Sequence, residues 1–109
     1  GLTLKNKSNQ SEKWIVIRTS AHQNLPDEHT RINVSRDKNY LATITGAIRT
    51  EKYASYYRFI GIDFFAGSSM SMYMVFGINN GWDWNGLPDD HNASQPHHII
   101  IDRSYLHGK

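Results

Sequence analysis

Two segments of the chain, residues 40–50 and 70–78, alternate apolar and polar side chains with a period of two. The apolar face consists of Tyr40, Ala42, Ile44 and Ile48 in the first segment and of Met70, Met72, Met74, Phe76 and Ile78 in the second. Successive side chains of a strand point to opposite sides of a sheet, so the pattern predicts strands with one buried face. We therefore expect a compact all-β domain.

Further short strands are predicted around these two segments, at 13–19, 31–35, 56–66 and 97–105. The polar residues 36–39 form a tight connection, which predicts a hairpin between strands 31–35 and 40–50. No segment keeps a helical period over ten residues. Six or seven short strands at this spacing favour a small antiparallel β-sandwich of the jelly-roll type.

The composition narrows the possible partners. A net charge of +2, with basic residues scattered along the chain, does not indicate a nucleic-acid ligand. The absence of cysteine excludes disulfides and thiolate metal sites. No apolar run approaches the ~20 residues of a membrane-spanning helix, so no membrane insertion is expected. The 3 Trp, 6 Tyr and 4 Phe exceed what so small a core needs, which predicts that some lie at an interface or a binding surface.

The segment 81–96 (GWDWNGLPDDHNASQP) is the longest irregular stretch and the predicted ligand-binding site. The candidate binding residues are Trp82, Asp83, Trp84, Asn85, Asp89, Asp90 and His91. The two tryptophans lie two residues apart, so an extended backbone would present both rings on one side. Aromatic rings beside carboxylates and amides suit carbohydrate or peptide recognition. The alternative is that both tryptophans cap the core or fill a subunit contact.

Neither a metal site nor a catalytic site is predicted. The acidic and histidine residues of the same region lack the regular spacing of a calcium loop, and adjacent histidines such as His97 and His98 should point to opposite faces of a strand. The chain has no nucleophile elbow, no phosphate-binding glycine loop and no metalloprotease helix. We therefore expect a protein that is not an enzyme and needs no cofactor.

The opening residues Gly1-Leu2-Thr3-Leu4 are similar to the end of an adenovirus fibre shaft, and the remainder of the chain resembles a small fibre head of the short reptilian or avian type, or another trimeric viral or phage fibre tip. The resemblance implies that residues 1–12 end a shaft or form a linker and that 13–109 form a sandwich head. It also implies a homotrimer at the fibre tip on the virion surface, made in the host cell. Such a head binds a host cell-surface receptor, either a protein or a sialylated glycan. Because the chain begins with Gly1 rather than Met, we expect a fragment or a processed form.

The sequence leaves three other functions open. The first is a carbohydrate-binding module or lectin-like domain that is not part of a fibre. The second is a fragment of a glycosidase or esterase, which would need convergent carboxylates or a triad. The third is a structural capsid or tail component whose aromatic residues serve assembly only.

Overall fold

The computed structural model describes residues 1–7, 12–67, 74–77 and 95–108. Within these ranges no helix is long and apolar enough to span a bilayer. The strands are β1 (Leu2–Leu4), β2 (Ile15–Arg18), β3 (Ala42–Thr45), β4 (Ile48–Thr50), β5 (Ser55–Ile60), β6 (Ile62–Phe65), β7 (Met74–Val75), β8 (His97–Asp102) and β9 (Tyr105–His107). One α-helical turn, α1 (Val34–Asp37), and two 3-10 turns, His22–Asn24 and Lys38–Tyr40, complete the described elements.

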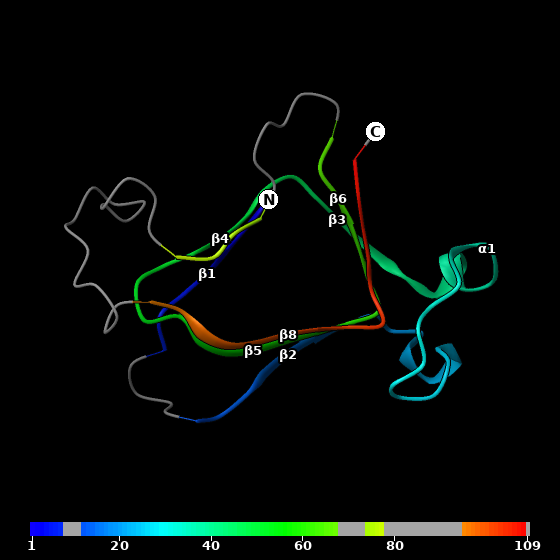
Figure 1. Ribbon diagram of the computed structural model, residues 1–109, viewed down its shortest axis with the longest axis horizontal. Coiled ribbons are helices and arrows are strands. Elements are labelled where there is room, and N and C mark those ends of the chain that lie inside the picture. The colour runs from blue at the N-terminus through cyan, green and yellow to red at the C-terminus, as the bar shows by residue number, and fades with distance from the viewer. Residues whose placement is uncertain (8–11, 68–73, 78–94, 109) are drawn as a thin grey trace.

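Each strand pairs in parallel with the strand three places along the chain. The result is three sheets, β1-β4-β7, β2-β5-β8 and β3-β6-β9. Figure 1 shows these sheets as the three sides of a triangle around which the chain winds. The fold is therefore a parallel β-solenoid of three stacked coils, β1–β3, β4–β6 and β7–β9.

The predicted antiparallel β-sandwich is wrong, because every strand pairing is parallel. Alternation with a period of two specifies a strand with one buried face but not the direction of its neighbours. The predicted strand 40–50 is two strands, β3 and β4, separated by a corner at Gly46. The apolar run 56–66 likewise divides into β5 and β6 at Gly61. Both corners turn the chain from one side of the triangle to the next.

The predicted strand 31–35 and its hairpin are also wrong. The Asn33 side chain accepts a hydrogen bond from the Arg36 amide (3.2 Å), so it caps the first turn of α1. The predicted strand 97–105 is β8 and the start of β9, with Arg103 at the corner between them in a left-handed conformation (φ 43°). Of the predicted strand 70–78, residues 70–73 and 78 lie outside the described ranges.

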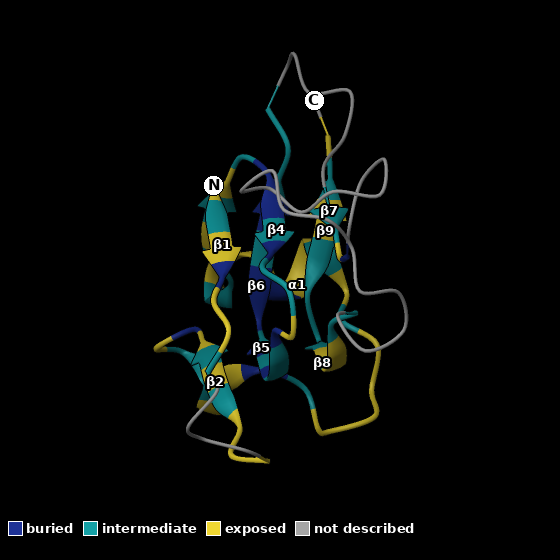
Figure 2. Cartoon of the chain, turned by 90° about the vertical axis from the view of Figure 1, so that its left-hand side faces the viewer, coloured by how far each residue is buried: buried dark blue, intermediate teal, exposed yellow. Residues whose placement is uncertain are grey.

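The core lies along the axis of the solenoid and is tightest in the middle coil. Phe59 is fully buried, and its register partners on either side are Ile17 and Ile101. The Phe59 ring meets the Phe64 ring edge to face across the Gly61 corner, with the ring centres 5.2 Å apart. Figure 2 shows the buried positions concentrated in β4, β5 and β6. Stacked coils on both sides exclude water from the middle coil, whereas each outer coil has one stacked neighbour among the described residues.

A 23-residue excursion, residues 19–41, leaves the first coil between β2 and β3 and lies outside that corner of the triangle (Figure 1). It is anchored at Gly61. The Thr19 amide donates to the Ile60 carbonyl (3.0 Å), and the Ala42 amide donates to the Gly61 carbonyl (3.1 Å). Gly61 has φ +67°, and a Cβ at this position would lie 2.6 Å from Thr19 Cγ2. Only glycine satisfies both the backbone conformation and the close contact with the excursion.

We expect the substitution Phe59→Ala to lower the free energy of unfolding by about 3–5 kcal/mol, because it leaves a cavity between coils that cannot collapse freely. Urea denaturation followed by circular dichroism measures this change. Thr45→Ala, at an exposed position of β3, is the matched control and should change the free energy by about 0.5 kcal/mol or less. Equal effects of the two substitutions would contradict the assignment of Phe59 to the axial core.

Candidate functional site

The seven residues predicted from sequence to bind a ligand all lie outside the described ranges. They are Trp82, Asp83, Trp84, Asn85, Asp89, Asp90 and His91. Their role stays a prediction. The described residues bring together a different set, on the outer face of the sheet β2-β5-β8.

The outer face of this sheet consists of three rows of side chains that run across the stacked coils. Strand register aligns Val16 with Arg58 and Arg58 with Ile100 in the central row. Val16 and Ile100 are 47% and 40% exposed, although both are large apolar residues. Adjacent strands are ~4.8 Å apart and alternate residues on one strand are ~6.6 Å apart, so the rows form a regular surface. Two residues before the central row are Trp14, Tyr56 and His98, whose rings contact one another. Two residues after it are Arg18, Ile60 and Asp102, which pair in register.

Four aromatic rings gather at the first row, three from the row itself and one from the adjacent His97. We call them the aromatic cluster: Trp14, Tyr56, His97 and His98. The Tyr56 and His98 rings are stacked, with centres 4.5 Å apart and planes 10° apart. The Trp14 ring meets Tyr56 edge to face at 5.3 Å, and Trp14 is 41% exposed. Stacking between neighbouring coils fixes these ring positions. The cluster therefore presents an ordered aromatic surface to solvent.

The backbone of this row departs from regular strand geometry. Tyr56 and His98 both have left-handed φ angles, 61° and 54°. The prediction that His97 and His98 point to opposite faces is wrong, since their Nδ1 atoms lie 2.6 Å apart. One of these nitrogens donates a hydrogen bond to the other. The described residues contain no group of three or more His, Cys, Asp or Glu side chains placed to hold a metal ion.

A groove of about 890 Å³ lies between the excursion and the outer coil of the solenoid. Its wall on the excursion side is residues 28–32 and Val34, and its other wall is Arg58 and residues 100–106. Arg58 and Ile100 also belong to the central row of the outer face. The groove thus continues the exposed face that begins at the aromatic cluster.

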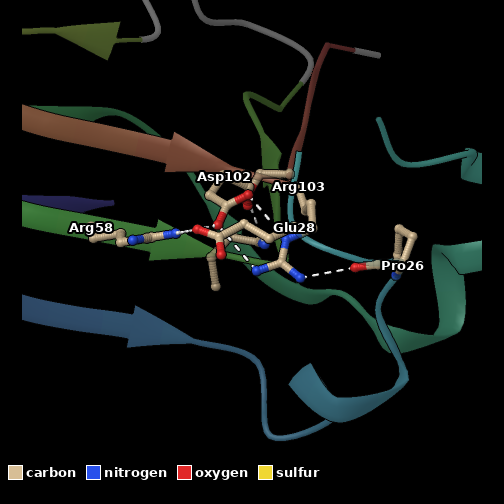
Figure 3. Close-up of polar contacts among 7 residues, drawn as sticks. Pro26, Glu28, Arg58, Asp102 and Arg103 are labelled. Carbon is tan, nitrogen blue, oxygen red and sulfur yellow. Dashed lines mark hydrogen bonds and ion pairs between the residues drawn. The ribbon is translucent and has the colours of Figure 1, made fainter. Parts of the chain in front are cut away.

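Ion pairs at the groove connect three elements that are distant in sequence (Figure 3). Arg103 donates to Asp102 through Nε (3.0 Å) and Nη2 (3.1 Å), and through Nη1 to the Pro26 carbonyl (2.9 Å). Arg58 Nη2 donates to Asp102 Oδ2 (2.7 Å) and to Glu28 Oε1 (3.1 Å). These contacts tie the excursion to β5 and to the corner after β8.

The two arginines hold Asp102 in its charged form. Two hydrogen bonds from Arg103 and one from Arg58 together outweigh desolvation and lower the pKa of the Asp102 carboxyl, with Arg103 contributing most. The hydrogen bond with Asp102 is also the main cause of the raised pKa of Arg58. Both carboxylate oxygens are engaged, so Asp102 is suited to holding the groove in shape rather than to exchanging protons.

A second polar cluster lies on the sheet β3-β6-β9. His107 Nε2 is 2.6 Å from Asp63 Oδ1, and its Nδ1 is 3.0 Å from the Gly108 carbonyl. The His107 ring also stacks on Tyr105 with centres 4.4 Å apart. Both ring nitrogens of His107 therefore have partners within the chain, which makes this cluster a less favourable ligand site than the groove.

No protein-family model, curated protein or solved structure matches this chain. The function of the site therefore has to be inferred from its own geometry. Exposed, ordered aromatic rings adjoin aliphatic side chains and a groove with guanidinium and carboxylate groups. This arrangement can bind an extended ligand that has both apolar faces and hydrogen-bonding groups.

We expect Asp102→Asn to lower the free energy of unfolding by roughly 1–3 kcal/mol at pH 7, because it removes the negative charge that pairs with Arg58 and Arg103. The loss is smaller than for a fully buried ion pair, since Asp102 is partly exposed. The folded-state pKa of Asp102 lies below its unfolded value, so this stabilisation is present above about pH 4 and is lost as the pH falls through the folded-state pKa. Urea denaturation at pH 7 and pH 3 should therefore show a difference between wild type and variant that shrinks in acid.

Asp27→Asn, at an exposed position of the excursion, serves as the control and should be close to neutral at both pH values. A difference between wild type and Asp102→Asn that stayed constant from pH 7 to pH 3 would contradict the charged state assigned to Asp102.

Proposed function

We propose that this protein binds carbohydrate on the outer face of the sheet β2-β5-β8. The observation that carries the proposal is the aromatic cluster, in which rings from three successive coils lie together on the surface. A sugar ring has an apolar face that packs on an aromatic side chain, while its hydroxyl groups need hydrogen-bonding partners at the edges. The cluster supplies the aromatic rings, and the imidazoles and the charged groove supply the hydrogen-bonding partners.

The dimensions of the face support an extended ligand. His98 and Asp102 are four residues apart on β8, a separation of about 13 Å along the strand. The exposed side chain of Ile100 lies between them on the same face. A chain of several sugar units could contact the aromatic cluster at one end and the groove at the other.

The charged state of Asp102, the less exposed of the two acids in the groove, favours binding over catalysis. Asp102 accepts hydrogen bonds on both oxygens from two arginines, and its pKa is lowered. A general acid needs a raised pKa in order to hold a proton near neutral pH. We therefore propose recognition without bond cleavage.

The attachment role that the fibre-head resemblance implied is a special case of this proposal, in which the carbohydrate is a host-cell glycan. The homotrimer stays a prediction from the sequence. If three copies assemble, a weak site in each would gain avidity when the sites engage one surface together. Light scattering of the purified protein measures the number of copies directly.

We expect Trp14→Ala to weaken glycan binding about tenfold or more, because a tenfold loss corresponds to ~1.4 kcal/mol, which is within reach of one exposed aromatic contact. A glycan array identifies ligands of the wild-type protein, and calorimetry with one of them measures the loss. Trp14 is exposed, so the fold should survive the substitution.

Phe76→Ala is the matched control, since Phe76 is 38% exposed but follows β7 in a different sheet. Its affinity for the glycan should equal that of the wild type. The proposal fails if no glycan binds the wild-type protein, or if Trp14→Ala binds as tightly as Phe76→Ala.

A further inference from the structure

The groove beside the aromatic cluster has an excess of positive charge. Its lining contains three guanidinium groups, from Arg31, Arg58 and Arg103, and two carboxylates, from Glu28 and Asp102. The outer face and the groove share Arg58, so a ligand on the face would reach this charge. The three arginines differ in the donors that they can offer to such a ligand.

Arg103 has a structural role. Its Nε and Nη2 donate to Asp102, and its Nη1 donates to the Pro26 carbonyl of the excursion. All three nitrogens are thus engaged within the chain. A ligand could recruit Arg103 only by detaching the excursion from the corner after β8.

Arg58 has donors to spare. Its two hydrogen bonds both come from Nη2, one to Asp102 and one to Glu28. Its Nε is buried without a hydrogen-bond partner in the described part of the chain, and Nη1 makes no hydrogen bond to any described residue. The buried Nε cannot reach a ligand, so the accessible edge is the one formed by Nη1 and Nη2. Once Glu28 leaves Nη2, this edge can bind a carboxylate with two parallel N–H donors.

Glu28 occupies the mouth of the groove as a replaceable partner of Arg58. Its side chain is 59% exposed, and its contact with Arg58 is the longer of the two that Nη2 makes. An exposed ion pair of this kind contributes little, so a ligand could displace Glu28 at small cost. Asp102, which is only 14% exposed and also held by Arg103, would stay in place.

We propose that the groove selects a sugar that bears a carboxylate, and that this carboxylate takes the place of Glu28 on Arg58. The apolar side chains of Ile100 and Ile32 line the groove beside Arg58 and would contact the body of the ring. The exposed Arg31, for which no hydrogen bond or ion pair to another described residue is found, would add attraction at the rim. This inference rests on the proposed carbohydrate function and names the class of sugar that the site prefers.

The test compares an oligosaccharide of glucuronic acid with its methyl ester, because esterification removes the charge and leaves the rings unchanged. We expect the acid to bind wild-type protein about tenfold more tightly than the ester, and this preference to shrink with added salt. Sialyllactose and a sulfated oligosaccharide, each beside its uncharged parent, show whether other carboxylates or other anions share the preference.

Arg58→Gln should reduce the preference for the acid to about twofold or less, because the bidentate partner is gone. Glu28→Gln should instead raise the affinity for the acid by about threefold to tenfold, since it removes the competing carboxylate from an exposed position, while Arg103 still holds the excursion through the Pro26 carbonyl. Neither substitution should change the affinity for the ester. Trp14→Ala should weaken the binding of acid and ester by the same factor.

The outcomes separate this inference from the proposed function. If acid and ester bind equally and both depend on Trp14, carbohydrate binding stands and selection by charge is refuted. If Glu28→Gln weakens the binding of the acid, Glu28 is a ligand contact and the displacement is refuted. A preference for the sulfated over the carboxylated sugar would refute selection for a carboxylate and indicate a general anion site. If neither acid nor ester binds, both proposals fail.

Discussion

The in-register parallel stacking of coils is the interaction on which the rest of the structure depends. Hydrogen bonding between β2, β5 and β8 places each residue of one coil beside its equivalent in the next, and this acts on both faces of the sheet at once. Inside, it brings Ile17, Phe59 and Ile101 into one apolar row. Outside, it brings Trp14, Tyr56 and His98 within ring-contact distance. The core and the candidate site are therefore two consequences of one pairing register.

The sequence predicted where several strands lie but not how they pair. Alternation located strands that contain residues 15–18, 42–45 and 97–102, because a strand with one buried face has the same period in a sandwich and in a solenoid. A solenoid is normally recognised by an internal repeat. Here the two turns take 46 and 26 residues when measured on β1-β4-β7, 42 and 42 on β2-β5-β8, and 20 and 42 on β3-β6-β9. The spacing therefore differs from sheet to sheet, in part because of the excursion 19–41, and this conceals the repeat.

The candidate site was only partly accessible to sequence analysis. The surplus of aromatic residues indicated a binding surface, but nothing local connects Trp14 with Tyr56, or Arg58 with Asp102, which is 44 residues away. Such pairs can be predicted only when the strand register is known, because the register determines which residues of successive coils lie side by side. Glu28 is exposed and lies 30 residues from Arg58 in the chain. Its relation to Arg58 depends on the excursion folding back against the solenoid, which Gly61 permits.

The backbone at the aromatic cluster gives an independent reason to connect this row with function. Left-handed φ angles in bulky residues cost on the order of 1–3 kcal/mol each and are concentrated at functional sites. Tyr56 and His98 both adopt this conformation between the register pairs Ser55–His97 and Tyr57–Ile99, so the departure recurs at the same point of two successive coils. Its effect is to turn both His97 and His98 outward and to stack His98 on Tyr56. A regular strand would hold one of the two histidines inside, so the strained backbone enlarges the exposed aromatic surface.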